Sequence, residues 1–293
     1  MVFMPGTDVA TDGRHHLGKE DEKALARDSE GLLLAGRSAV VTGGGSGIGR
    51  AIALALARHG ASVLVADLVR ESAEETVRAI HGENDAAVAA AVGMDVSDPA
   101  SVQEGIDRAA GLFGGVSILV NNAGLQHVAP IDEFPLERWN RLVAVMLTGP
   151  FLCTKAALPH MRRARWGRVI NIASIHGKYA SPFKAAYVSA KHGVIGLTRA
   201  TAVETAQDGI TANAICPGYV DTPLVRNQIP DLMRNFGVGT EEEALEAAVY
   251  SRTPQRRLLD PAEVAGLAVY LCSDAARGIT GQAINLDGGM VMY

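Results

Sequence analysis

Residues 42–49 read Thr42-Gly43-Gly44-Gly45-Ser46-Gly47-Ile48-Gly49 and directly follow the apolar run Ala39-Val40-Val41. The apolar run predicts a buried strand, and the residues from Gly49 to His59 predict a helix. Glycines in such a turn let the backbone approach a pyrophosphate, and a helix N-terminus offers it unpaired N–H groups and partial positive charge. A glycine motif by itself is often only a structural turn, but strand and helix on either side favour a dinucleotide-binding turn.

The alternation of short apolar strands and amphipathic helices continues along the chain. We expect further strands within 62–66, 87–92, 118–120, 168–172, 211–215 and 283–285, and further helices within 72–81, 99–112, 137–161, 186–206 and 261–271. Such units form a parallel sheet covered on both faces, so the predicted fold class is α/β, a single doubly wound Rossmann-type domain.

This domain is expected to span residues 32–293, and the polar residues 1–31 are expected to form a flexible N-terminal extension. Residues 219–259 lack strand signals and have one charged helical segment at 240–251. Because ligands bind at the carboxyl ends of strands in open α/β sheets, we expect residues 219–259 to form a lid over the substrate.

Composition excludes several classes of protein. The 293 residues are 48% hydrophobic, which is enough for a large core, and the net charge of −5 provides no positive field for nucleic acid or an anionic membrane. We expect no membrane-spanning stretch, because no apolar run approaches about 18 residues, and the acidic N-terminal residues do not resemble a signal peptide. Three distant cysteines, Cys153, Cys216 and Cys272, predict buried free thiols and no metal site. The sequence therefore predicts a cytoplasmic protein.

Asp67 ends the second expected strand, about twenty residues after the glycine turn. A carboxylate at this place can accept hydrogen bonds from both ribose hydroxyls of NAD and would repel the 2′-phosphate of NADP. Asp67 could instead be a helix N-cap or a solvated charge. The nearby Arg70 weakens the preference for NAD over NADP without reversing it. The sequence thus predicts NAD as the cofactor.

The spacing of Gly43, Gly47 and Gly49 resembles that of the short-chain dehydrogenase/reductase family, and the resemblance extends from Gly36 to Gly289. It implies a set of cofactor-binding residues: Gly43, Ser46, Gly47, Ile48, Gly49, Asp67, Asp95, Val96, Asn122, Ala123, Gly124, Tyr187, Lys191, Pro217, Gly218, Val220 and Thr222. Asn121, which precedes Asn122, could equally serve only to fasten neighbouring strands.

Ser174, Tyr187 and Lys191 are the catalytic residues that the resemblance implies. Tyr187 and Lys191 stand four residues apart in an expected helix, so their side chains share one face. A tyrosine with a pKa near 10 needs a nearby positive charge to act as a base at neutral pH, and Lys191 can supply it. In the family pattern Tyr187 exchanges a proton with the substrate, Ser174 binds the reacting oxygen, and Lys191 also holds the nicotinamide ribose.

Met146 departs from the family pattern, which usually has an asparagine there to hold a water that connects the lysine to solvent. A thioether is a weak acceptor and donates nothing, so the usual proton relay cannot run through this side chain.

A further set of residues resembles the D-3-hydroxybutyrate dehydrogenases, and this resemblance implies that Gln126, His176, Lys184 and Gln228 hold a substrate carboxylate. A small anionic substrate needs a cation and neutral donors near the catalytic tyrosine, and these side chains provide them. Each could instead be an ordinary loop residue. Tyr219 stands where these enzymes often have tryptophan, and it closes an apolar side around a methyl group. With Ser174 and Tyr187 these five residues form the expected substrate site.

The leading hypothesis is therefore NAD-dependent, reversible oxidation of D-3-hydroxybutyrate, or a close short 3-hydroxy acid, to the 3-oxo acid, a step of ketone body metabolism. A second hypothesis is reduction of a 3-oxoacyl thioester or oxidation of a sugar-derived alcohol on the same fold. A third, suggested by Met146, is an NAD-binding regulatory protein with impaired catalysis. The family resemblance also implies a homotetramer, with the helices at 137–161 and 186–206 forming one interface.

Overall fold

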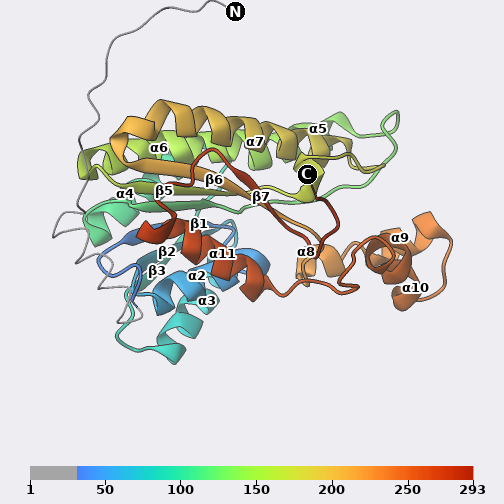
Figure 1. The fold of residues 1–293 in the computed structure, drawn as a ribbon, viewed down its shortest axis with the longest axis horizontal. Coiled ribbons are helices and arrows are strands. Elements are labelled where there is room, and N and C mark those ends of the chain that lie inside the picture. Colours follow the sequence, from blue (N-terminus) through green and yellow to red (C-terminus); the bar gives the residue numbers. More distant parts are fainter. Residues whose placement is uncertain (1–31, 293) are drawn as a thin grey trace, which may run out of the picture.

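The computed structural model describes residues 32–292. In this part of the chain seven parallel strands form one sheet, in the order β3-β2-β1-β4-β5-β6-β7 (Figure 1). The strands are β1 (Ser38–Thr42), β2 (Ser62–Asp67), β3 (Ala89–Gly93), β4 (Ile118–Asn121), β5 (Gly167–Ile172), β6 (Ile210–Pro217) and β7 (Ala283–Leu286). The order reverses between β1 and β4, which confirms the expected doubly wound α/β fold. The extension expected at 1–31 lies outside the described residues.

Helices cover both faces of the sheet (Figure 1). One face carries α2 (Gly47–Arg58), α3 (Arg70–Glu83) and α11 (Pro261–Cys272), and the other carries α4 (Pro99–Phe113), α5 (Leu136–Val143), α6 (Gly149–Ala164) and α7 (Ala185–Thr205). Side chains of β1 alternate between the two cores: Val41 packs under α2, and Val40 packs under α4 and α6. Both faces of each central strand are therefore buried, which explains why the sequences of these strands are continuous apolar runs.

The helix expected at 137–161 is interrupted by a π-helical turn, η2 (Ala144–Thr148), between α5 and α6. Such turns insert one extra residue and are frequent at functional sites. Met146 lies in this turn with 1% of its surface exposed. The hydrophobic periodicity predicted the helix but did not reveal the extra residue.

The same helical stretch, Leu136–Ala164, is long and apolar enough by length and composition to cross a membrane. The expectation that no apolar stretch approaches that length was therefore wrong. Its most apolar window is 44% buried inside the protein, and α6 contributes Cys153, Ala157 and Met161 to the core. A core helix of a domain has this pattern.

Residues between β6 and α11 form α8 (Pro223–Arg226), α9 (Ile229–Phe236), α10 (Glu241–Leu245) and a π-helical turn, η5 (Glu246–Tyr250). Only the segment at 240–251 was predicted as helical, so α8 and α9 were missed; both are short helices that begin beside a proline. Figure 1 shows α8, α9 and α10 beyond one end of the sheet. Residues of α9, α10 and η5 form a small apolar cluster of their own there.

Gly49, in the first turn of α2, has no room for a side chain. A Cβ there would lie 2.1 Å from the Gly43 carbonyl oxygen and 2.4 Å from the Asn122 amide nitrogen. We expect Gly49→Ala to lower the free energy of unfolding by about 2 kcal/mol, because overpacking against backbone forces the turn to shift. Urea denaturation measures this loss.

Gly111 in α4 is the matched control, since a Cβ there would meet no atom within 4 Å. Gly111→Ala should keep or slightly raise stability, by about 0.5–1 kcal/mol, because glycine is a poor helix former. Equal stability of the two variants would contradict the packing argument.

Candidate active site

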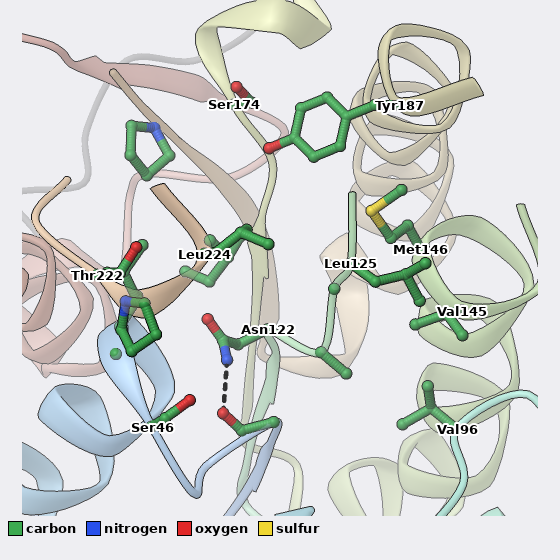
Figure 2. A pocket seen from close by; sticks show the side chains of 18 of the residues that line it. Ser46, Val96, Asn122, Leu125, Val145, Met146, Ser174, Tyr187, Thr222 and Leu224 are labelled. Carbon is green, nitrogen blue, oxygen red and sulfur yellow. Dashed lines mark hydrogen bonds between the residues drawn. The ribbon is translucent and has the colours of Figure 1, made fainter. Parts of the chain in front are cut away.

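The glycine turn after β1 is held against the end of β4. Gly43 has φ +61, and a Cβ there would lie 2.8 Å from the Cα of Ala123. The Asn122 amide donates to the carbonyls of Thr42 at 3.0 Å and Gly43 at 2.9 Å. The turn is therefore fixed at the point where the strand order reverses (Figure 2).

The neighbouring Asn121 points into the protein instead. Its amide donates to the Asn171 side chain at 2.8 Å and to the Thr154 hydroxyl at 3.3 Å. Asn121 thus fastens β4 to β5 and is not one of the residues that line the cavity described next.

A cavity of about 390 Å³ opens at the glycine turn, within the size range of ligand sites. All residues that the sequence predicted for the cofactor line it, except Gly49, which lies beneath the turn. Further lining residues that the sequence analysis did not single out as cofactor residues are Leu68, Met94, Leu125, Arg141, Val145, Met146, Ile172, Ala173, Ser174, Pro223, Leu224 and Val225. Figure 2 shows the side chains of Val145 and Met146 at one wall and Thr222 and Leu224 at the opposite wall.

Asp67 lies at one end of this cavity, where both carboxylate oxygens accept backbone N–H groups. Gly45 donates to one oxygen at 2.9 Å, and Val69 donates to the other at 3.0 Å. Arg70 is paired with Glu74 on α3 at 2.9 Å, so a carboxylate of its own helix already compensates its charge. The carboxylate of Asp67 is thus oriented by the turn that it faces.

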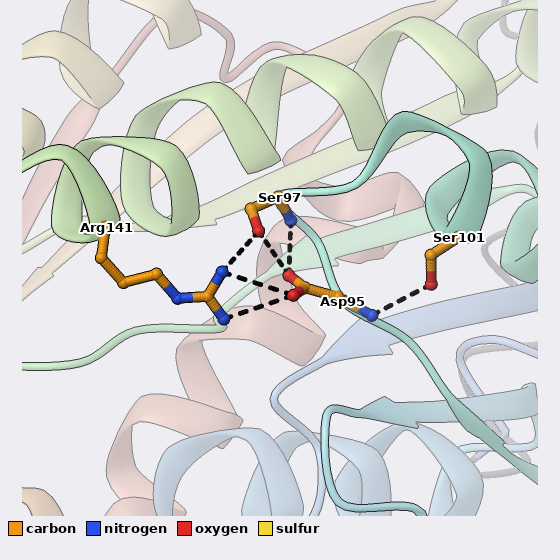
Figure 3. A network of polar contacts seen from close by, with 4 residues as sticks. All are labelled: Asp95, Ser97, Ser101 and Arg141. Carbon is orange, nitrogen blue, oxygen red and sulfur yellow. Dashed lines mark hydrogen bonds and ion pairs between the residues drawn. The ribbon is translucent and has the colours of Figure 1, made fainter. Parts of the chain in front are cut away.

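Asp95 belongs to a polar network that the sequence did not reveal (Figure 3). One oxygen accepts the Ser97 backbone N–H at 2.9 Å and the Ser97 hydroxyl at 2.6 Å, and the other accepts two bonds from Arg141 at 3.3 Å. Burial acts to raise the pKa of Asp95, but these bonds outweigh it and the pKa is lowered. Arg141 was missed because it lies 46 residues from its partner.

Ser174 and Tyr187 face each other across the far end of the cavity (Figure 2). Ser174 precedes the 3₁₀ turn η3 (Ile175–Gly177) and accepts the His176 backbone N–H at 3.1 Å. Burial raises the pKa of Tyr187, and a hydrogen bond with the Ser174 side chain opposes the rise. The two hydroxyls therefore lie together at this end of the cavity.

Lys191 lies beneath Tyr187 on α7, with its ammonium nitrogen 5.6 Å from the centre of the tyrosine ring. The ammonium donates to the Ile172 carbonyl at 2.6 Å, and burial lowers its pKa to about 8. The expectation that this charge lowers the pKa of Tyr187 is not met in the protein alone, where the pKa is raised and burial of the phenol is the main cause. Met146 offers no hydrogen bond to either side chain.

A smaller cavity of about 50 Å³ adjoins the Tyr187 end. It shares five lining residues with the larger one: Ser174, Tyr187, Gly218, Leu224 and Val225. The residues that line it include the whole predicted substrate set: Gln126, Ser174, His176, Lys184, Tyr187, Tyr219 and Gln228. These residues come from four separate segments of the chain, and the fold brings all of them together.

The smaller cavity carries a positive charge without a counter-ion. Lys184 is 6% exposed, its ammonium lies 5.7 Å from the centre of the Tyr219 ring, and no carboxylate among residues 32–292 pairs with it. Burial lowers its pKa to about 8, so it is mostly protonated at neutral pH. Burial and the nearby Lys184 lower the pKa of His176 to about 3, and its buried Nδ1 has no partner within the described residues. One cation and neutral polar groups form a site suited to a small anion.

Metal ligands do not gather in the described part of the chain, where no three His, Cys, Asp or Glu side chains could hold one ion. Cys153, Cys216 and Cys272 are buried free thiols, as expected. Burial raises the pKa of Cys153 to about 12, which keeps this thiol protonated.

Comparisons with known proteins agree with this geometry. A family model described as Enoyl-(Acyl carrier protein) reductase matches residues 43–291. The uncharacterized oxidoreductase YxjF of Bacillus subtilis is 49% identical over 251 residues, which cover 86% of this chain and 96% of that protein. The D-beta-hydroxybutyrate dehydrogenase of Cupriavidus necator is 46% identical over 259 residues, covering 88% and 99% respectively.

Among solved structures, levodione reductase superposes with a TM-score of 0.82 at 33% identity, covering 87% of this chain and 98% of that one. The sequence match and the shared fold lead to one assignment. The chain belongs to the short-chain dehydrogenase/reductase family, and it is an oxidoreductase of the kind that uses a nicotinamide cofactor and acts on hydroxyl groups.

Proposed function

We propose that the protein catalyses the NAD-dependent, reversible oxidation of D-3-hydroxybutyrate, or a close short 3-hydroxy acid, to the 3-oxo acid. The observation that carries this proposal is the uncompensated Lys184 ammonium in the same small cavity as Ser174 and Tyr187. A short acid with its carboxylate at Lys184 presents its hydroxyl to Tyr187. The similarity to a D-beta-hydroxybutyrate dehydrogenase supports the same substrate.

In the proposed reaction Tyr187 takes the proton from the substrate hydroxyl and returns it to the ketone in the reverse direction. Ser174 donates a hydrogen bond to the reacting oxygen. Lys191, anchored on the Ile172 carbonyl, stabilises the tyrosinate as it forms. The residues that line the larger cavity would hold the nicotinamide cofactor, which when bound would supply the hydride acceptor for the substrate carbon. Because Met146 cannot hold a relay water through its side chain, the proton leaves Tyr187 by a route that does not use that side chain.

NAD is the cofactor that Asp67 supports, since its oriented carboxylate would repel a 2′-phosphate. We expect Asp67→Asn to reduce the NAD-to-NADP ratio of kcat/KM about tenfold or more, because one nearby negative charge is lost. Glu75→Gln is the matched control: it removes an exposed charge from α3 outside the cavity and should keep the ratio. An unchanged ratio in Asp67→Asn would show that this carboxylate does not select the cofactor.

The panel that tests the whole proposal is a series of 3-hydroxy acids of increasing chain length, assayed with NAD and with NADP by NADH or NADPH absorbance. Oxidation of the short acids with NAD is the expected result. A 3-oxoacyl thioester or a sugar-derived alcohol lacks the free carboxylate that Lys184 would hold, so turnover of those substrates alone would favour the second hypothesis. No turnover of any of them would favour a regulatory NAD-binding protein.

We also propose that the enzyme works in the cytoplasm as a homotetramer. Phe151 on α6 and Val203 on α7 are exposed apolar side chains, 48% and 82% exposed. They lie on the helix pair that the family resemblance implies at one interface, and burial of such surface favours association.

A further inference from the structure

A third cavity, of about 130 Å³, lies between the start of α7 and helix α9. We call it the outer chamber. Lys184, Tyr219 and Gln228 line both the outer chamber and the small cavity at Tyr187, so these residues form the partition between them. Its other walls include Phe183, Leu232, Phe236 and Arg252. The partition therefore has Ser174 and Tyr187 on one side and a second, partly open space on the other.

The outer chamber is electrostatically positive. Arg252 makes no ion pair within residues 32–292, and its charge acts to lower the pKa of Tyr219 against the effect of burial. Asp231 also lines the chamber, but it is paired with Arg234. Lys184 and Arg252 are thus two cations without carboxylate partners at one space.

The backbone at the partition is held in an unusual conformation. Phe183, directly before Lys184, has φ +65, which is rare for a bulky side chain. Its carbonyl accepts the Ala129 N–H at 3.0 Å, which ties this conformation to the loop after β4. Such conformations persist where the surrounding structure fixes them, often at ligand sites.

We propose that the outer chamber binds the carboxylate of hydroxy acids longer than the 3-hydroxy acids. The carboxylate lies between Lys184 and Arg252, and the carbon chain passes Tyr219 and Gln228 to bring the hydroxyl to Tyr187. A volume of 130 Å³ exceeds the roughly 10–15 Å³ needed per water several times over, so a carboxylate with a short methylene chain fits. The apolar walls accommodate the methylenes. This proposal rests on the proposed function, because it uses the same reacting end.

The test is a substrate series in which only the carboxylate arm grows: 3-hydroxybutyrate, 4-hydroxypentanoate and 5-hydroxyhexanoate, each with NAD. We expect the enzyme to oxidise all three. Arg252→Met should raise KM for 5-hydroxyhexanoate about tenfold, since a charged donor to the carboxylate is lost, and should change KM for 3-hydroxybutyrate less than about twofold. The control is Arg78→Met, which makes the same charge change on the exposed face of α3. It should alter neither the KM for 5-hydroxyhexanoate nor the KM for 3-hydroxybutyrate.

A second measurement separates binding from turnover. The enzyme–NAD complex is titrated calorimetrically with acetoacetate and with 5-oxohexanoate, which cannot react because the cofactor is already oxidised. Arg252→Met should weaken the binding of 5-oxohexanoate and leave the binding of acetoacetate unchanged. If Arg252→Met weakened the binding of both acids equally, or of neither, the outer chamber would not be a carboxylate site. Failure of the unsubstituted enzyme to bind 5-oxohexanoate would overturn the proposal as well.

The two proposals fail in different ways. If 3-hydroxybutyrate is not oxidised but 5-oxohexanoate binds in an Arg252-dependent manner, the proposed substrate is wrong and the outer chamber stands. If 3-hydroxybutyrate is oxidised and the longer acids neither bind nor react, the proposed function stands and the outer chamber is wrong.

Discussion

Tyr187→Phe should lower kcat about a thousandfold, because it removes the one hydroxyl on α7 that lies at the reacting end of the cavity and can exchange a proton with the substrate. The ring, its packing and the Lys191–Ile172 bond at 2.6 Å are retained. The substitution therefore removes proton transfer and little else. The measurement is steady-state NADH formation from 3-hydroxybutyrate.

The control for Tyr187→Phe is the affinity for NADH, measured by fluorescence titration. It should change less than about threefold, because the residues of the glycine turn and Asp67 are unaffected. A variant that kept a tenth or more of kcat would show that another group transfers the proton. A large loss of NADH affinity would show that the tyrosine acts mainly by holding the cofactor.

Lys184→Ala should lower kcat/KM for 3-hydroxybutyrate on the order of a hundredfold, mainly by raising KM, since a charge-assisted hydrogen bond to the carboxylate is lost. Removing a buried cation with no counter-ion should leave the fold intact. The matched control is Lys155→Ala on α6, which lies outside both cavities. A loss of less than about threefold in Lys184→Ala would make the carboxylate site wrong.

The pH dependence of binding follows from the same residue. Burial lowers the pKa of Lys184 to about 8. Below that pH the ammonium is charged and attracts the substrate carboxylate, whereas above it the amine is neutral and affinity falls about tenfold per pH unit. The affinity of the enzyme–NAD complex for acetoacetate should follow this curve. Lys184→Ala should bind weakly with no such decline around pH 8 if Lys184 causes it.

Much of the fold and part of the candidate site could be predicted from local sequence patterns. The strand, glycine turn and helix around Gly43 are encoded within a few residues, because hydrogen bonding and hydrophobic periodicity act at that range. The same holds for Tyr187 and Lys191, whose spacing of four places both on one face of α7. The family resemblance then supplied Gln126, His176, Lys184 and Gln228, which no local pattern would have connected.

The features that the sequence did not predict depend on contacts between residues far apart in the chain. Arg141 reaches Asp95 across 46 residues, and neither residue carries a local signal for the other. The π-helical turn around Met146 and the short helices α9 and α10 depend on the surfaces against which they pack. The positive charge of the outer chamber likewise depends on where Arg252 falls relative to Lys184.

By itself the sequence determined the α/β class and the strand, glycine turn and helix around Gly43, since each depends on neighbours along the chain. The family resemblance implied the catalytic residues Ser174, Tyr187 and Lys191. Only the tertiary structure decided how these groups behave. Burial raises the pKa of Tyr187, lowers that of Lys184, and leaves Lys184 without a counter-ion between two cavities. The reason is that desolvation and charge compensation depend on which distant segments enclose a group, and only the folded chain sets that enclosure.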